Sequence, residues 1–440
     1  MTRGSMTRRS VNRNAEAALL GMAAVLAAMG VALVNFTQGG WLDAQVAVTF
    51  TVFAAGFGAV NLALRRWAPT ASPYLFPLAA FLTAIGFTEI YRIDPDLATV
   101  QRWSLLVAGG VSSVLLFALR DQGVEALRRY RYLFLAAAVG LLMLPLLPTD
   151  WTFLRGAEVN GSRLWVRLEV AGRVLSFQPG EVAKLLLVVF LASYLGDRHL
   201  AMATTRRSIG RLRLPEPRQL FPVLVAAGAA FAVLVYQRDL GASLLLFALF
   251  VGMMYAATGR AAYLAVGGTL VAAGGVAAYR LFDHVQVRVF SWLHPFDDFT
   301  GAGYQIAQAM FALGSGSLTG SGIGLGSPYL IPAAATDFVF AAVGEEMGLA
   351  GSIAVLTGFA LLVAIGFGIA LRARDVFRKF LAAGLTLVLG VQAILIVAGV
   401  LRLFPVTGIT LPFMSYGGSS LLANMILVTL LARISHAERA

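Results

Sequence analysis

The sequence predicts an all-α polytopic membrane protein with about 12 transmembrane helices and one large extracytoplasmic loop. Hydrophobic residues make up 59% of the 440 residues and charged residues only 13%, against about 25% charged in soluble domains. The apolar residues fall in blocks of about 17 to 24, the length that crosses a hydrocarbon core of about 30 Å as a helix. Cysteine is absent, which excludes disulfides, thiol nucleophiles and cysteine-bound metals.

The first apolar block is interpreted as an uncleaved helix. Arg3, Arg8, Arg9 and Arg13 precede it, as in a signal peptide, but the block is too long and a second one follows at once. Cleavage is the alternative.

The apolar blocks predict twelve spans. They cover residues 16–36, 45–64, 74–91, 102–119, 132–147, 179–195, 220–236, 240–258, 261–282, 346–371, 380–401 and 412–434.

The basic residues predict the orientation of these spans. Of the 34 Lys and Arg residues, 23 fall in the alternate connections that share a side with the N-terminus. This asymmetry is the positive-inside pattern, so both termini are expected in the cytoplasm. The net charge of +12 is therefore a topology signal and a contact with anionic membrane lipids, and no nucleic-acid partner is expected.

Two outward connections are long, at residues 148–178 and 283–337. Loops of this length in a compact protein are usually functional. The second contains a helical pattern at residues 303–314, which we expect to lie across the outer surface as an interfacial helix.

Ionisable residues inside a membrane are costly and are hypotheses of function by default. Pro179 suits the first turn of a helix, and Glu181 and Lys184 follow on one face. One interpretation is an ion pair that neutralises itself at a helix start. The other makes Lys184 a phosphate ligand facing a cavity, with Glu181 orienting it.

Other polar residues of the outer side form weaker candidates. Arg163 and Trp165 combine a phosphate-binding side chain with one that packs against sugars or lipids. Asp239 follows Arg238 in a tight turn, where a structural pair that caps helix ends is the commoner role. Ser415 and Tyr416 lie in a Gly- and Pro-rich interruption of an apolar stretch, which indicates a pocket or a moving gate.

The histidines show no metal-ligand spacing, so no metal site and no required cofactor are predicted. His294, Asp297 and Asp298 leave a divalent cation as the alternative to a solvated turn. The glycines between residues 314 and 326 neither follow a strand nor precede Lys-Ser or Lys-Thr, which excludes a nucleotide-binding loop.

At these segments the sequence resembles the FtsW/RodA/SpoVE (SEDS) family of membrane glycosyltransferases, with a RodA-like pattern. The resemblance covers about residues 74–434. Its matching runs are residues 161–165, 177–184, 237–241, 301–308, 335–348 and 405–420. It implies a core of ten helices at 73–434 that includes the loop 283–337, two additional helices at 16–72, a basic cytoplasmic N-terminus at 1–15 and a cytoplasmic tail at 435–440.

The resemblance also implies a function at the outer face of the bacterial cytoplasmic membrane. It implies an inverting peptidoglycan glycosyltransferase that polymerises lipid II, an undecaprenyl-pyrophosphate-linked substrate, beside a class B penicillin-binding protein. Asp337 matches the essential loop aspartate and is expected as the catalytic base, with a helix cap as its alternative role. Lys184, Glu181, Arg163, Trp165, Asp239, Gln305, Ser415 and Tyr416 are expected to bind substrate.

Three positions depart from the family pattern. Ala333 to Ala335 replace a usual Glu-x-His, Arg238 replaces a Pro, and Leu164 replaces an Arg. They affect the assignment of donor and acceptor contacts and leave the family resemblance intact. A lipid II flippase and a non-catalytic scaffold of the wall-synthesis complex are the alternative functions, and elongation and division remain two alternative roles.

Overall fold

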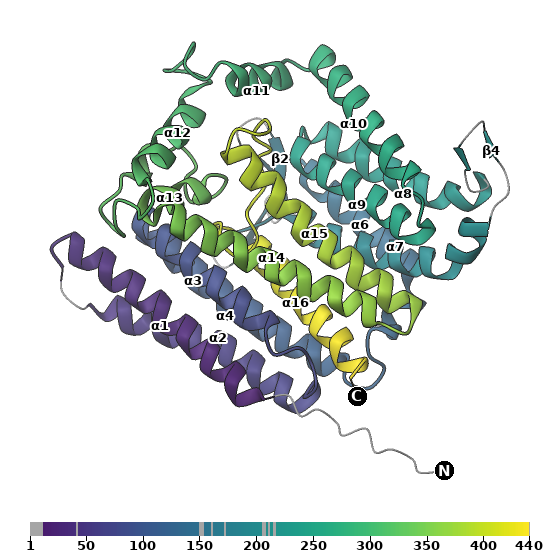
Figure 1. Cartoon of the computed structure of the whole chain (residues 1–440), viewed down its shortest axis with the longest axis horizontal. Helices are drawn as coiled ribbons and strands as arrows, with labels where there is room; N and C mark the ends of the chain where they lie inside the picture. Colours follow the sequence, from purple (N-terminus) through teal and green to yellow (C-terminus); the bar gives the residue numbers. More distant parts are fainter. Residues whose placement is uncertain are drawn as a thin grey trace.

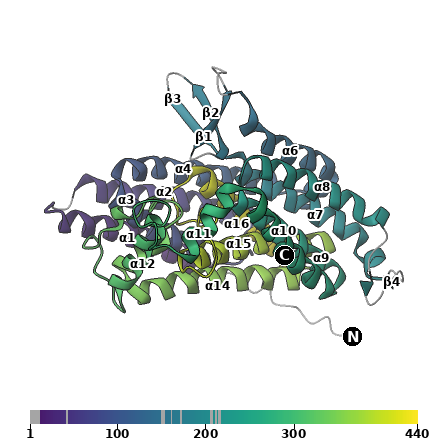
Figure 2. The same cartoon turned by 90° about the horizontal axis from the view of Figure 1, so that it is seen from above.

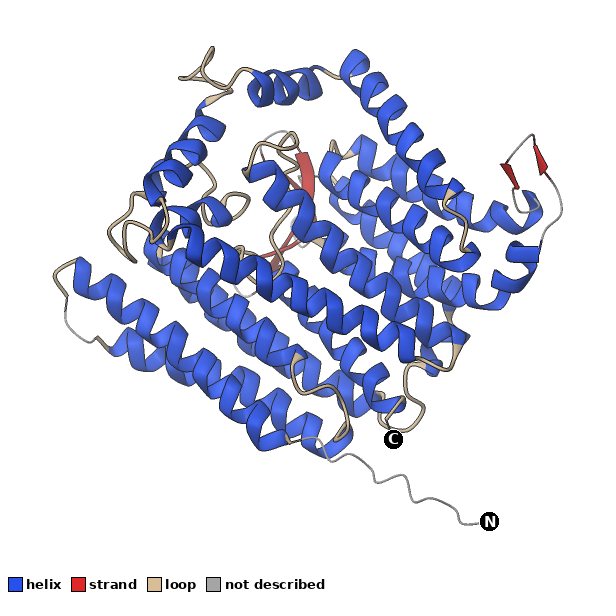
Figure 3. Cartoon of the chain, viewed as in Figure 1, coloured by secondary structure: helices blue, strands red, loops and turns tan. Residues whose placement is uncertain are grey.

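A computed structural model gives the fold of most of the chain. It describes residues 12–40, 43–148, 154–159, 162–170, 173–204, 208–209, 212–213 and 217–439. Helices make up most of this part (Figure 3), and they pack side by side in one bundle (Figure 1). The polytopic helical fold predicted from the sequence is therefore confirmed.

Ten helices in the described residues are long and apolar enough to cross a membrane. They are α1 (Arg13–Thr37), α2 (Ala44–Trp67), α3 (Leu75–Ile93), α4 (Pro95–Ala118), α7 (Pro179–Thr204), α9 (Leu240–Thr258), α10 (Ala262–Leu281), α14 (Gly348–Arg372), α15 (Val376–Val400) and α16 (Gly418–Ala437). Two shorter apolar stretches, at residues 131–146 and 221–236, occupy the two other predicted blocks. The first lies in α6 (Arg131–Met143) and the turn after it, and the second lies in α8 (Pro217–Tyr236). A total of twelve spans stays a prediction.

The centre of the bundle is formed by α3, α7, α15 and α16, which are the most buried of the long helices. Gly86 of α3 lets the segment just before α16 approach closely, since an added Cβ at Gly86 would lie 2.4 Å from the Cα of Met414. The helix α10 is the least buried and packs along α9 at the edge.

The structure adds strands that the sequence analysis did not predict. β1 (Leu154–Val159), β2 (Ser162–Val170) and β3 (Arg173–Phe177) form an antiparallel sheet in the first long loop, and Figure 2 shows this sheet projecting from the helices. A second pair, β4 (Ser208–Ile209) and β5 (Leu212–Arg213), lies in the connection after α7. Part of the signal was present in β2, where Val166, Leu168 and Val170 alternate with Arg167 and Glu169.

The second long loop combines helices with irregular stretches. It contains α11 (Asp283–Leu293), α12 (Tyr304–Gly316) and a short turn at Pro328–Leu330, and α13 (Val339–Glu346) follows it. α12 confirms the helix expected at 303–314, and its interfacial position stays a prediction. The span expected at 412–434 begins instead at Gly418, because residues 401–417 form an irregular segment rich in Gly and Pro.

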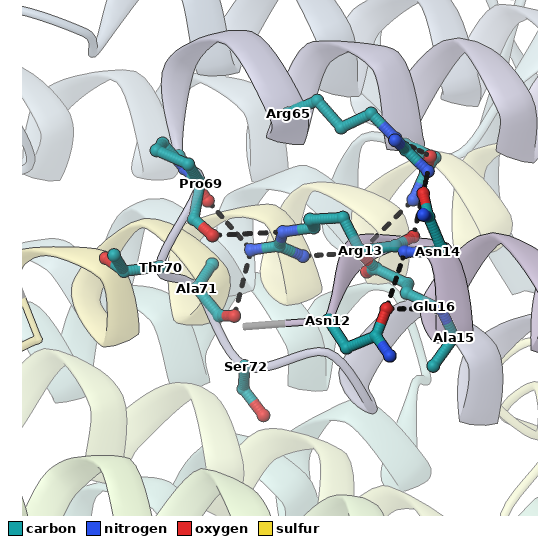
Figure 4. A network of polar contacts seen from close by, with 12 residues as sticks. Asn12, Arg13, Asn14, Ala15, Glu16, Arg65, Pro69, Thr70, Ala71 and Ser72 are labelled. Atoms are coloured by element: carbon teal, nitrogen blue, oxygen red, sulfur yellow. Dashed lines mark hydrogen bonds and ion pairs between the residues drawn. The ribbon is translucent and has the colours of Figure 1, made fainter. Parts of the chain in front are cut away.

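The N-terminal hairpin of α1 and α2 is firmly docked on the helices that follow it. The Arg13 guanidinium donates hydrogen bonds to the carbonyl oxygens of Ala68, Pro69 and Ala71 and pairs with the buried Glu16 (Figure 4). An arginine with five donors is well suited to hold three carbonyl groups and one carboxylate. The connection between the hairpin and the rest of the bundle is thus a defined structural joint.

Both termini lie at the same end of the bundle, which we call the basic end. The Thr70 hydroxyl next to the Arg13 joint hydrogen-bonds to His436 near the C-terminus, and Arg378 pairs with Glu125 and Glu438 there. A shared end is what an even number of spans produces. Residues 1–11 of the basic N-terminus lie outside the described residues.

We predict that this basic end faces the cytoplasm. Reporter fusions placed after residue 440 and within residues 283–298 should report opposite sides of the membrane, because the basic residues gather at the terminal end. Activity of both fusions on one side would contradict the topology.

Candidate active site

Lys184 and Glu181 form a buried pair at the start of α7, at the end of the bundle opposite the basic end. Their exposed fractions are 4% and 7%, and the Lys184 Nζ donates to Glu181 Oε2 at 2.7 Å. The same Nζ donates to Gln392 Oε1 of α15 at 2.7 Å, and Gln392 Nε2 donates to the Thr410 carbonyl at 2.7 Å. The predicted ion pair is confirmed. The ammonium has three donors, so one remains for a ligand.

Asp239 lies at the turn between α8 and α9 and caps α9. Its Oδ1 accepts a hydrogen bond from the Ala242 amide at 2.8 Å, as expected for a structural role. Burial raises the pKa of its carboxyl to about 6, although the Ala242 N–H and the Arg288 guanidinium favour the charged form, and Glu181 raises it further. Asp239 therefore lies within electrostatic reach of both α7 and α11.

Asp337 follows a short loop that the irregular segment 401–417 holds in place. The Tyr416 amide donates to the Ala335 carbonyl at 2.7 Å, and the Ser415 hydroxyl donates to the Thr336 carbonyl. Ser415 and Tyr416 thus support the Asp337 loop directly. The helix-cap alternative for Asp337 is wrong, because α13 starts after Phe338 and no side chain caps it.

Arg288 of α11 brings these carboxylates together. Its guanidinium donates to the Val406 and Thr407 carbonyls, both at 3.3 Å. Gly408 marks the meeting point, because a Cβ there would lie 3.6 Å from Arg288 Nη2 and 3.8 Å from Asp337 Oδ2. The structure therefore gathers Lys184, Glu181, Asp239, Asp337 and Arg288 at one end of the bundle.

The environment of Asp337 favours a proton acceptor. Burial raises the pKa of its carboxyl to about 6, the nearby Arg288 guanidinium and the Thr336 hydroxyl lower it, and Asp239 raises it. A carboxylate with such a pKa is a stronger base than an exposed aspartate and is still ionised at neutral pH.

Three predicted substrate-binding residues lie apart from this cluster. Arg163 in β2 pairs with Glu158 at 3.3 Å on an exposed surface, and Trp165 lies opposite Ala157 in the sheet. Gln305 of α12 donates to the Pro332 carbonyl at 2.8 Å. No contact in the described part of the chain joins any of them to Lys184 or Asp337, and their binding of substrate stays a prediction.

Arg288 and Gln392 were missed by the sequence analysis. Arg288 could have been recognised as a candidate from the sequence, because it is the only Lys or Arg between residues 283 and 337. No sequence feature marked Gln392 as a candidate, since one amide in a long apolar helix has many structural uses.

The alternative of a divalent cation at His294, Asp297 and Asp298 is not supported by their geometry. His294 Nδ1 lies 3.5 Å from Asp297 Oδ2, and both side chains are exposed. Across the described ranges, no group of three or more His, Asp or Glu residues could hold a metal ion. No residue is therefore assigned to a cation.

The close contact between the α9 turn and the irregular segment yields a prediction. A Cβ added at Gly241 would lie 2.6 Å from both the Thr407 carbonyl oxygen and the Ile409 Cγ2. We expect Gly241→Ala to destabilise the protein by about 1–3 kcal/mol through overpacking, measured by thermal unfolding in detergent. Gly228→Ala is the matched control, because its Cβ would meet nothing within 4 Å. Equal melting temperatures of the two variants would refute this packing.

Fold and site together define a multi-pass membrane protein with a charged, partly buried polar site at one end of its bundle. The sequence of the chain shows which family this is. The profile of the FtsW/RodA/SpoVE family, described as a cell cycle protein family, matches residues 67–440, and the chain belongs to this family.

Named relatives match most of the chain or nearly all of it. It is 40% identical to the peptidoglycan glycosyltransferase RodA of Mycobacterium tuberculosis over 439 residues, which cover 97% of this chain and 91% of that protein. It is 31% identical to stage V sporulation protein E of Bacillus subtilis, over 79% of this chain and 90% of that protein.

Solved structures share the fold. A chain from a peptidoglycan synthase complex, described as coordinating polymerization and crosslinking, is similar with a TM-score of 0.66 and 29% identity, covering 84% of this chain and 98% of that one. The rod shape determining protein RodA of Thermus thermophilus gives a TM-score of 0.54 and 28% identity, covering 84% and 97%.

Proposed function

We propose that this chain is a peptidoglycan glycosyltransferase that polymerises lipid II into glycan strands at the outer face of the cytoplasmic membrane. Relatives that carry this enzyme name match 97% of the chain. The observation that carries the proposal is the partly buried Asp337 carboxyl beside the Arg288 guanidinium, at the same end as Lys184.

In the proposed reaction an acceptor sugar hydroxyl attacks the anomeric carbon of a lipid-linked donor. The new C–O bond forms as the bond to the lipid pyrophosphate breaks, and the hydroxyl proton passes to Asp337. A single displacement of this kind inverts the anomeric centre. General-base assistance contributes about 10²- to 10⁴-fold to such a step.

The pyrophosphate leaving group requires positive charge more than a proton. Lys184 has one free ammonium donor, and its pair with Glu181 and Gln392 fixes its position. Arg288 supplies a guanidinium fork that suits phosphate oxygens. These cations act in a poorly hydrated site, where they stabilise a diphosphate more than they would in water.

The pH dependence of polymerisation tests the role of Asp337. Its carboxyl accepts a proton only when ionised, so the initial rate should fall as the pH drops through about 6. Arg288→Gln removes a cation that favours the ionised carboxyl, so the pKa of Asp337 should rise. The acidic limb of the pH–rate profile should therefore move to higher pH.

The measurement is the initial rate of glycan formation from lipid II between about pH 5 and about pH 8. Arg280→Gln on the exposed face of α10 is the control and should keep the wild-type limb. Superimposable acidic limbs for Arg288→Gln and wild type would remove Asp337 from this role.

A class B penicillin-binding protein is the proposed partner. The similar peptidoglycan synthase complex, in which polymerization and crosslinking are coordinated, supports this choice. A role in elongation is supported by the RodA relatives, which cover 97% of the chain, whereas the family profile begins only at residue 67. The additional helices α1 and α2 thus fall within the part shared with those relatives.

A further inference from the structure

An apolar groove lies between α11, α12 and the end of α15. Figure 1 shows that α10, α11 and α12 form an arch around this end of α15. Its volume is about 440 Å³. Leu293 and Leu401 on its rim are 48% and 42% exposed, so the groove opens to the surroundings. Its lining consists of Trp292, Leu293, Met310, Leu313, Val400, Leu401 and Arg402.

Arg402 is fixed in this groove by a reciprocal set of hydrogen bonds with α11. The Trp292 Nε1 donates to the Arg402 carbonyl at 3.0 Å, and Arg402 donates from Nε to the Trp292 carbonyl and from Nη2 to the Leu293 carbonyl, both at 2.7 Å. The backbone of Arg402 adopts φ 57°, a left-handed conformation that non-glycine residues seldom hold.

The Arg402 guanidinium keeps donors for an anion. Two of its five N–H groups bond to carbonyl oxygens, and Nη1 directs one toward the Met310 sulfur at 3.9 Å. The remaining N–H groups have no partner among the described contacts. A cation with free donors in an apolar groove suits a ligand that has an anionic head and a hydrocarbon chain.

The groove is close to the candidate active site. Trp292 follows Arg288 by four residues in α11, so both lie on one face of the helix, about 6 Å apart along its axis. Arg288 lies beside Asp337 at Gly408. The apolar groove therefore begins about one helical turn from the reacting groups.

We propose that this groove binds the lipid-linked donor through its polyprenyl chain, with Arg402 bound to a pyrophosphate oxygen. The proposal rests on the proposed function, because it assigns a place to the lipid that becomes the leaving group. The charge of Arg402 matches the diphosphate, and the apolar lining matches the chain. A membrane phospholipid is the competing occupant, which the experiment below distinguishes.

The test is photocrosslinking of the full chain, purified in detergent, with a diazirine-bearing polyprenyl pyrophosphate. Label is expected on α12 at residues 310–313. Excess unlabelled undecaprenyl pyrophosphate should suppress this label. Phosphatidylglycerol at the same concentration as that competitor should leave the label in place.

Two matched variants locate the label. Leu313→Trp fills the groove and should lower the label about tenfold or more, since overpacking costs enough free energy for that change. Leu318→Trp, at a position 69% exposed in the same loop, should keep it. Arg402→Lys keeps the charge and should retain more label than Arg402→Gln.

Label that phosphatidylglycerol removes equally well, or label that survives Leu313→Trp, would overturn the inference. The outcome is independent of turnover, because Asp337→Asn should crosslink normally. For the wild-type chain, polymerisation without this label would reject the groove alone, and label without polymerisation would reject the proposed function.

Discussion

Asp337→Asn is expected to abolish glycan polymer formation. The substitution keeps the size of the side chain but removes the proton acceptor, so turnover should fall by about 10²- to 10⁴-fold. Folding should survive, because Asp337 caps no helix and its loop is held through the Ala335 and Thr336 carbonyls. The measurement is polymer length and yield from lipid II on gels.

Asp297→Asn is the matched control, because it removes an exposed carboxylate of the same loop. It should polymerise like wild type. Both variants should co-purify equally with the penicillin-binding protein partner. Near wild-type polymer from Asp337→Asn would assign the base to another residue.

Lys184→Met should cost both activity and stability. The buried Glu181 would lose its only cation within hydrogen-bond distance in the described structure. Removing one partner of a buried pair typically costs about 3–5 kcal/mol. We therefore expect a large drop in thermal stability in detergent, because Glu181 would stay buried without its cation.

The double variant Glu181→Gln with Lys184→Met separates the two effects. It removes the unpaired charge, so stability should largely return while lipid II polymerisation stays absent. Arg120→Met is the control, since its ion pair with Asp121 is exposed and should contribute about 1 kcal/mol or less. Normal polymerisation by the double variant would show that Lys184 only neutralises Glu181.

Much of the fold was predictable because it follows from local sequence. Blocks of apolar residues give the helices, and Pro179 begins α7 as expected. The spacing of Glu181 and Lys184 predicts their pairing, since residues three apart lie on one helical face. The interruption near Ser415 also follows from its Gly and Pro content.

The assembly of the site could not be predicted in the same way. Gln392 reaches Lys184 across 208 residues, and Arg288 reaches Val406 across 118 residues. Such contacts depend on how helices pack, and no local pattern encodes them. The β1–β3 sheet was missed for a different reason, because its strands are short and their local pattern is much weaker than the long apolar blocks that predict helices.

The most direct test of the central claim uses lipid II vesicles that contain the purified chain with its partner. The account predicts glycan polymer on the outer side from lipid II supplied there, which depends on Asp337 and persists when the penicillin-binding protein's crosslinking is inhibited. Movement of lipid II across the vesicle membrane without any polymer would contradict it and identify a flippase, and absence of both would leave a scaffold.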